Sequence, residues 1–338
     1  MATFVRTQEI AHEIGEQGRF ALRLTSSDVE MRGDDGTVAR VRITFEIRAG
    51  TESEADEIFD RLRYEVTQGV GSLEVSEPKH GPGAGLGSLV RLFGIGSGQV
   101  ETEVRVDAPR LSDLRFEGVS ADLTAMGLRG AQDYRTVSGD LVLDGAGGDM
   151  RVKGVSSDIS LRAEAPLASL EINTVSGDVS CVAPRIEQLR ATTVSGDVEL
   201  EGVLADGPQH RIETVSGDVS LGVTDNLTVE VRGLSSDADI RLPHRSEGSR
   251  DRRRYVIGDG GAQLLFSSMS GDIEVRPPRR TGHTPPTPPT PVTPPAPRPP
   301  AIDDDDQLSV LRALERGEID VEEATRRLGG GSRGTSDV

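Results

Sequence analysis

A five-residue motif returns along this chain, and its spacing constrains the fold more than any other feature. Thr-Val-Ser-Gly-Asp occupies residues 136–140, 174–178, 193–197 and 214–218. Looser copies, in which an apolar residue precedes serine and aspartate closes the motif, occupy 119–122, 155–158, 234–237, 269–272 and, less clearly, 26–28. From Asp122 onward the aspartates are 18, 18, 20, 19, 21, 19 and 35 residues apart. A period near 19 is too short for paired helices and is typical of one coil of a β-solenoid.

Each copy predicts a corner between two strands. An apolar residue precedes the serine and another follows the aspartate, and we expect both to point into the stack: Val137/Leu141, Val155/Ile159, Val175/Val179, Val194/Val198, Val215/Val219 and Met269/Ile273. Glycine supplies free backbone angles, and aspartate accepts hydrogen bonds from the backbone of its own turn. Alternation such as Val198-Glu199-Leu200 predicts a half-buried strand after the corner, and Leu170-Glu171-Ile172 predicts a second strand before the next one.

These patterns predict an all-β fold, a β-solenoid resembling a parallel β-helix, with coils of about 19 residues. Neighbouring coils must stack, because no single coil can bury its own apolar face. Aromatic residues make up only 3% of the chain and there are 40 glycines, which favours a thin stack with many turns. We also expect a small inserted helix near the N-terminus and a C-terminal helical hairpin.

Stacking raises an electrostatic question about the aspartates. Parallel strands lie about 4.8 Å apart, and two unit charges at that distance repel by about 0.9 kcal/mol in water. Either each carboxylate accepts backbone hydrogen bonds and is well solvated, or cations bridge the column. We predict the first, with Asp178, Asp197 and Asp218 as structural acceptors and no bound metal.

Five regions follow from the changes of pattern along the chain. They are an N-terminal entry or capping region with strands, one helix and a glycine-rich loop (1–110), the repeat solenoid (111–276), a proline-rich linker (277–302), a helical hairpin (303–328) and a disordered tail (329–338). In the entry region, 20–31 and 38–47 alternate like strands. Thr51 and Glu54 predict a capped helix over 51–66.

The hairpin is amphipathic but too small to be stable alone. Leu308, Leu311 and Leu314 share one face of its first helix, and Gly317 separates the two helices. We therefore predict that it associates with a protein partner or with a second copy of itself.

Composition and the scattered reactive residues argue against several functions. A net charge of −18 disfavours binding to nucleic acid or to anionic membranes. Cys181 is the one cysteine and occupies an inward repeat position, where a small buried hydrophobe is expected. The five histidines show no metal-binding or catalytic-triad spacing: His12, His80, His210, His244 and His283. We predict no catalytic residue, no cofactor-binding residue, no metal ligand and no enzyme activity.

Location and two further segments are less constrained. Residues 1–23 contain no apolar core of signal-peptide length, and no run of 18 apolar residues could form a transmembrane segment. Cytoplasmic residence is the expectation, which leaves room for peripheral contact with the envelope. We expect the apolar segment 89–95 either to pack over an end of the solenoid or to act as a self-association or membrane-contacting loop. The arginine-rich segment 245–254 is a solvated protruding loop or an anion-binding one.

The Ser-Gly-Asp coils over residues 20–276 resemble the bacterial putative-adhesin domain of unknown function, a β-solenoid family. Residues 308–324 are similar to the short oligomerisation-type helical hairpin, SHOCT-like, that is often joined to such domains. The resemblance implies a binding scaffold without catalytic residues, and some members of this broad family are linked to envelope stress.

These features are consistent with three functional hypotheses. The favoured hypothesis is a non-enzymatic, adhesin-like scaffold with a tethered C-terminal association module. The alternative is an envelope-stress sensor or ligand-binding module, and the lesser alternative is a carbohydrate-active enzyme on a β-helix. Identically repeated aspartates count against the enzyme, since acid–base catalysis needs two carboxyl groups in different environments.

Overall fold

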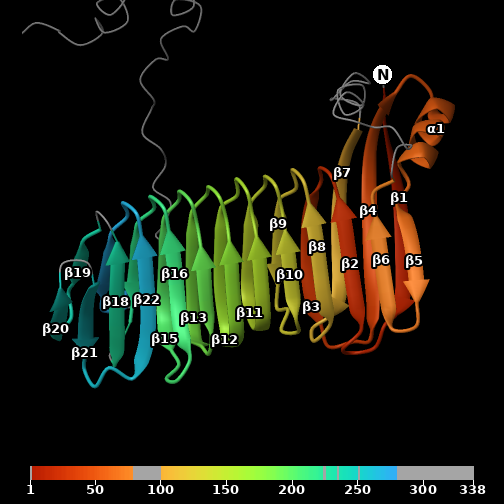
Figure 1. Cartoon of the computed structure of the whole chain (residues 1–338). Coiled ribbons are helices and arrows are strands. Elements are labelled where there is room, and N and C mark those ends of the chain that lie inside the picture. Colours follow the sequence, from red (N-terminus) through yellow and green to blue (C-terminus); the bar gives the residue numbers. More distant parts are fainter. Residues whose placement is uncertain (1, 79–99, 224–225, 234–235, 250–251, 280–338) are drawn as a thin grey trace, which may run out of the picture. The chain divides into compact units, whose positions relative to one another are not determined.

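The described part of this computed structural model is a stack of β-coils built in two facing rows (Figure 1). It covers residues 2–78, 100–223, 226–233, 236–249 and 252–279. The chain divides into two units, Met1–Arg280 and Thr281–Val338. The predicted hairpin and tail, nearly all of the predicted linker, and the segments 81–87 and 89–95 lie outside the described residues. The all-β prediction is confirmed, with one helix among the described residues.

Parallel pairing joins the strands of the first row, and each of them except the first runs into a serine–aspartate corner. They are β6 (Ser72–Ser76), β2 (Arg19–Leu24), β8 (Asp113–Gly118), β10 (Gln132–Arg135), the last residues of β11 (Leu141–Lys153) and β12 (Ile159–Asn173), β14 (Leu189–Thr192), β16 (Gln209–Thr214), β22 (Ala262–Ser268) and β18 (Leu227–Gly233).

Parallel pairing also joins the strands of the second row, and each of them except the first leaves a corner. They are β7 (Val100–Pro109), β3 (Asp28–Asp34), β9 (Leu123–Met126), the first residues of β11 and β12, β13 (Val179–Ile186), β15 (Val198–Leu204), β17 (Val219–Gly222), β23 (Ile273–Arg276) and β19 (Ala238–Ile240).

The core lies between the two rows and follows the predicted alternation after each corner. Val179, Val198 and Val219 are in register on adjacent strands and are only 2%, 3% and 1% exposed. Leu170 and Ile172 of the predicted second strand are buried as well. This inward column is confirmed.

The residue before each serine does not point into the stack, so that half of each predicted pair is wrong. These side chains are 40–56% exposed: Val137, Val155, Val175, Val194, Val215 and Met269. The buried residue is one position earlier, a threonine such as Thr136 or Thr174, both 5% exposed. Alternation along the arriving strand continues into the corner, since Tyr134 and Thr136 are both buried, and the next side chain therefore faces outward.

The coils are not stacked in sequence order at the C-terminal end. Strand β22 pairs with β16 on one side and β18 on the other, and β23 likewise lies between β17 and β19. The last coil in the sequence, 262–276, is therefore inserted before the coil that precedes it. The 35-residue spacing from Asp237 to Asp272 arises because the chain turns back to this inserted position. On the way it forms an antiparallel hairpin of β20 (His244–Ser249) and β21 (Arg252–Ile257). The arginine-rich segment is thus largely strand; its residues 250–251 are outside the described ranges.

The N-terminal end adds antiparallel strands and the helix. Strand β1 (Ala2–Glu13) pairs with β4 (Val38–Ala49), β4 pairs with β7, and β5 (Glu65–Gly69) pairs with β6. Because β2 pairs with β8, the stack runs across residue 110. Helix α1 (Glu52–Leu62) starts as predicted, with the Thr51 side chain accepting a hydrogen bond from the Glu54 amide at 3.2 Å.

An ion-pair clamp holds the last described residues against the stack. Arg276 lies 2.9 Å from Glu201 and 2.7 Å from Glu199, while the more exposed Arg279 lies 2.8 Å from Glu199. The side chains of Arg276 and Glu201 are only 11% and 10% exposed. Gly222 leaves room for this crossing, since a Cβ there would lie 3.0 Å from the Glu201 side chain.

Candidate binding surface

The corners align into a straight edge, and its outermost feature is a row of apolar side chains that we call the valine ridge. It comprises Val119, Val137, Val155, Val175, Val194, Val215 and Met269. The backbone fixes this arrangement: the Val175 carbonyl accepts the Ser195 amide at 2.9 Å, and the other coils repeat the bond. Six steps of about 4.8 Å make the ridge about 29 Å long.

The serines beside the ridge also use their side chains between coils. The hydroxyls of Ser138, Ser176 and Ser216 each lie 3.3 Å from the valine carbonyl of the preceding coil. The glycine that follows must approach its neighbour closely: Gly196 has φ +138°, and a Cβ there would lie 2.3 Å from the Gly177 carbonyl oxygen. The corner therefore requires glycine where the backbone takes this form.

From Asp122 to Asp272, the column aspartates accept a hydrogen bond from the adjacent coil, so the prediction that they accept from their own turn is wrong. The Oδ1 atom of Asp178 accepts the Asp197 amide at 2.9 Å, and Asp197 accepts the Asp218 amide at the same distance. The column continues through the inserted coil, with Asp218 accepting from Asp272 and Asp272 from Asp237. Adjacent corners are one strand spacing apart, so the aspartate amide of one coil reaches the aspartate carboxylate of the coil before it in the stack. The aspartates therefore join the coils together.

The aspartate column carries uncompensated negative charge. Within the described ranges, Asp237 is paired with Arg253 at 3.5 Å, whereas the others form no ion pair: Asp122, Asp140, Asp158, Asp178, Asp197, Asp218 and Asp272. Four of them and Glu199 line a hollow of about 340 Å³ beside the corner. The edge is therefore apolar along the ridge and anionic next to it.

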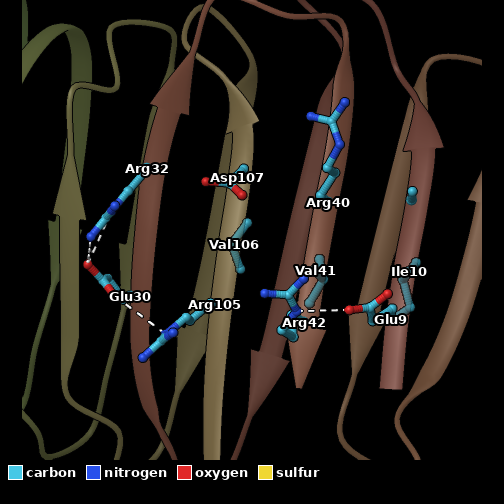
Figure 2. A pocket seen from close by; sticks show the side chains of 11 residues that line it. Glu9, Ile10, Glu30, Arg32, Arg40, Val41, Arg42, Arg105, Val106 and Asp107 are labelled. Atoms are coloured by element: carbon cyan, nitrogen blue, oxygen red, sulfur yellow. Dashed lines mark hydrogen bonds and ion pairs between the residues drawn. The ribbon is translucent and has the colours of Figure 1, made fainter. Parts of the chain in front are cut away.

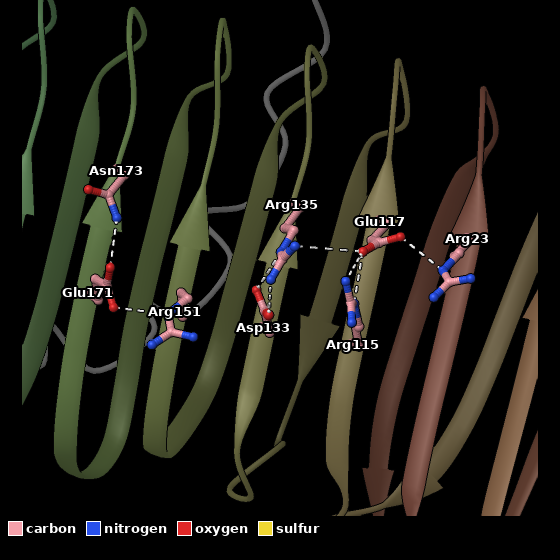
Figure 3. Close-up of polar contacts among 8 residues, drawn as sticks. All are labelled: Arg23, Arg115, Glu117, Asp133, Arg135, Arg151, Glu171 and Asn173. Carbon is pink, nitrogen blue, oxygen red and sulfur yellow. Dashed lines mark hydrogen bonds and ion pairs between the residues drawn. The ribbon is translucent and has the colours of Figure 1, made fainter.

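The outward face of the first row differs, because its charges neutralise one another (Figure 3). Arg23 lies 2.9 Å from Glu117, and Arg135 lies 2.8 Å from Asp133. Arg151 lies 2.9 Å from Glu171, and this pairing lowers the pKa of the Glu171 carboxyl below its usual value. Strand register brings these opposite charges side by side, so this face offers a ligand little net charge.

We expect Asp197→Ala to lower the free energy of unfolding by about 1 kcal/mol, because it removes one charged hydrogen-bond acceptor while water can still reach the amide. Asp197→Asn should stay close to wild type, since its amide oxygen can accept the same bond. Urea denaturation measures both. Millimolar calcium should leave the melting temperature unchanged. A calcium-dependent rise that is lost in D178A/D197A/D218A would instead support a cation ladder.

The reactive side chains in the core have structural roles. Cys181 is 1% exposed, as predicted, and burial raises the pKa of its thiol to about 12. His210 is fully buried; its Nδ1 accepts the Leu189 amide at 3.2 Å, and its Nε2 donates to the Ala205 carbonyl at 2.9 Å. Burial lowers the pKa of His210 below its ordinary value, which favours this neutral form.

Neither a metal-binding cluster nor a membrane-spanning helix is found among the described residues. No group of three or more His, Cys, Asp or Glu side chains there is placed to hold a metal ion. The helix in that part of the chain is too short and too polar to cross a membrane.

Stacked coils with identical corners define a repeat scaffold that presents a continuous edge. The chain belongs to the Toastrack DUF4097 family, whose model matches residues 18–207 and again 187–276, together more than half of the chain. Among curated proteins none is significantly similar in sequence.

Several solved structures align with the stack. A putative adhesin from Parabacteroides distasonis is 12% identical, with a TM-score of 0.37, covering 80% of this chain and 97% of that one. A putative adhesin from Parabacteroides merdae is 9% identical, with a TM-score of 0.33, covering 80% and 96%. A putative lipid binding protein from Parabacteroides distasonis is 14% identical, with a TM-score of 0.31, covering 80% and 97%. The terms adhesin and lipid binding protein apply to those proteins and not to this chain.

The sequence analysis did not predict the ridge, although the alternation along the arriving strands indicates it. Four of the ridge valines stand one residue after a threonine that continues the inward phase of the arriving strand: Val137, Val175, Val194 and Val215. Counting the alternation forward from Tyr134, instead of backward from the aspartate, places Val137 outside.

Proposed function

We propose that this protein is a non-enzymatic, adhesin-like binding scaffold whose valine ridge holds an extended or helical segment of a protein ligand. The observation that carries the proposal is the ridge itself, a row of seven evenly spaced apolar side chains that are 40–56% exposed. Isolated exposed apolar residues are normal, whereas a continuous row is typical of an interaction surface.

The negative charge of the aspartates beside the ridge indicates that the ligand also carries basic residues. The unpaired aspartates run parallel to the ridge, so a segment with apolar side chains on one side and lysine or arginine beside them complements both rows. A purely anionic ligand would meet the same carboxylates and be repelled.

The test uses peptides selected against the protein itself. Full-length protein is panned against a displayed library of linear dodecapeptides, and affinities of the enriched peptides are measured by fluorescence polarisation. We expect apolar, basic peptides and at least a tenfold loss of affinity in V155T/V175T/V194T, because each hydroxyl replaces an apolar contact without changing side-chain size. Peptides without basic residues, or peptides that bind this variant as well as wild type, would contradict the proposal.

A matched control replaces the same number of exposed valines at positions away from the ridge. V5T/V66T/V203T alters three outward valines, 54%, 36% and 38% exposed, on strands β1, β5 and β15. It should bind like wild type. Equal losses in the two variants would show that general surface hydrophobicity, and not the ridge, holds the peptide.

The proposal includes residues 303–328 as a tethered association module. These residues lie outside the described ranges, and the support is their sequence, whose pattern predicts two short amphipathic helices after a stretch that holds 12 of the 19 prolines. So small a hairpin needs added apolar surface from a partner or a second copy.

Truncation after Arg280 tests this module. The cut retains Arg276 and Arg279, so we expect a melting temperature within a degree or two of full length and a lower mass by light scattering. A second cut, after Val275, removes the clamp and should destabilise the stack, which separates association from stability. Equal masses for full-length protein and the Arg280 truncation would show that residues 303–328 do not mediate self-association.

A further inference from the structure

Four arginines line a groove over the antiparallel N-terminal strands and the adjoining end of the second row (Figure 2). Strands β1, β4, β7 and β3 lie side by side there. Two lines of residues cross them in register: Glu9, Arg42, Arg105 and Glu30 form one line, and Ala11, Arg40, Asp107 and Arg32 form the other.

The first line places two like charges directly opposite each other. Arg42 and Arg105 are cross-strand partners on β4 and β7, an arrangement that disfavours the fold because such side chains are only about 5 Å apart at Cβ. Arg42 lies 2.9 Å from Glu9, the outer carboxylate of its side of the line. Arg105 lies 3.8 Å from Glu30 on the other side and 2.7 Å from Glu103, two residues earlier on its own strand. No described acidic side chain stands between the two arginines in this line.

The arginines keep hydrogen-bonding capacity. A guanidinium has five N–H donors, and within the described residues Arg42 donates to Glu9 through Nε. Arg40 lies 3.5 Å from Asp34, which is a long contact. The four side chains are 56–61% exposed, so their remaining donors are accessible to a ligand.

The second line makes the surface hollow. Ala11 stands where the other strands carry long side chains, and the lining residues enclose about 450 Å³. Four arginines and three carboxylates, Glu9, Glu30 and Asp107, line it, so the lining has a net positive charge although the chain carries −18. Asp107 is opposite Arg40 in register but forms no ion pair among the described residues.

We propose that this groove binds a compact oxyanion of the phosphate type between Arg42 and Arg105. A phosphate would neutralise the unfavourable pair and accept bidentate hydrogen bonds from planar guanidinium groups, which suit it better than a point charge does. Asp107 at the rim weakens the site by repulsion. The groove is independent of the valine ridge, so V155T/V175T/V194T should not affect it.

The test is calorimetric titration of the full-length protein with inorganic pyrophosphate at low ionic strength. We expect binding that weakens with added salt, at least a tenfold loss of affinity in R42Q/R105Q, and a several-fold gain in D107N. The control R115Q/R151Q changes two exposed arginines on the outward face of the first row and should bind like wild type. All the altered side chains are partly exposed, and thermal melts confirm folding.

A second arm identifies the source of the phosphate. Vesicles containing phosphatidylglycerol are sedimented with wild type and with R42Q/R105Q. Arginine-dependent sedimentation would indicate a lipid headgroup, and pyrophosphate binding without sedimentation would indicate a free phosphate compound. The proposal is overturned if neither probe binds, if R42Q/R105Q binds both as well as wild type, or if D107N weakens pyrophosphate binding.

Discussion

Val198→Asp should unfold several coils together. Val198 is 3% exposed and stands between Val179 and Val219 in the inward column, where no described cation could pair with the new charge. Burying an unpaired carboxylate costs several kcal/mol, and coils that stack only on their neighbours lose both contacts at once. We expect a loss above about 4 kcal/mol, or no folded protein, by circular dichroism and urea denaturation.

The matched control is Val194→Asp, four residues earlier in the same motif. Val194 is 44% exposed on the ridge, so the same substitution should change the free energy of unfolding by about 0.5 kcal/mol. The pair distinguishes the two sides of one corner. Similar melting temperatures for the two variants would show that the inward and outward assignments are wrong.

Arg276→Met should destabilise the stack by about 3 kcal/mol, because it leaves the Glu201 carboxylate buried without its cation. The Glu201 side chain is 10% exposed and meets Arg276 at 2.9 Å, so solvent replaces the lost partner poorly. Thermal and urea denaturation of the full-length chain measure the effect.

Two further variants separate the buried pair from the exposed one. E201L/R276M exchanges both partners for apolar side chains and should recover most of the loss, since the cost arises from the unpaired charge. Arg279→Met removes an ion pair whose arginine is 70% exposed and should change stability by less than about 1 kcal/mol. If the double variant is no more stable than R276M, the destabilisation has another origin.

The corner motif shows which structural features the repeat pattern predicts correctly and which it does not. Thr51 and Glu54 predicted the capped helix, and the corner motif predicted strands on both sides of each aspartate and the buried column through Val198; all three are found. It assigned the residue before serine to the inside because an apolar residue is expected to be buried. The arriving strand decides that phase, and the corner backbone hydrogen bonds fix it.

The sequence alone determined the repeat, the coil length and the row of aspartates, because each depends on local turn chemistry and on alternation within one coil. Only the tertiary structure decided what lies next to what. The coil 262–276 lies between β16 and β18, and the aspartate amides donate to the carboxylate of the adjacent coil. The opposition of Arg42 and Arg105 is likewise a matter of register between β4 and β7, strands that lie far apart in the chain. Pairing between distant strands depends on which edges can meet, and no local pattern records that choice.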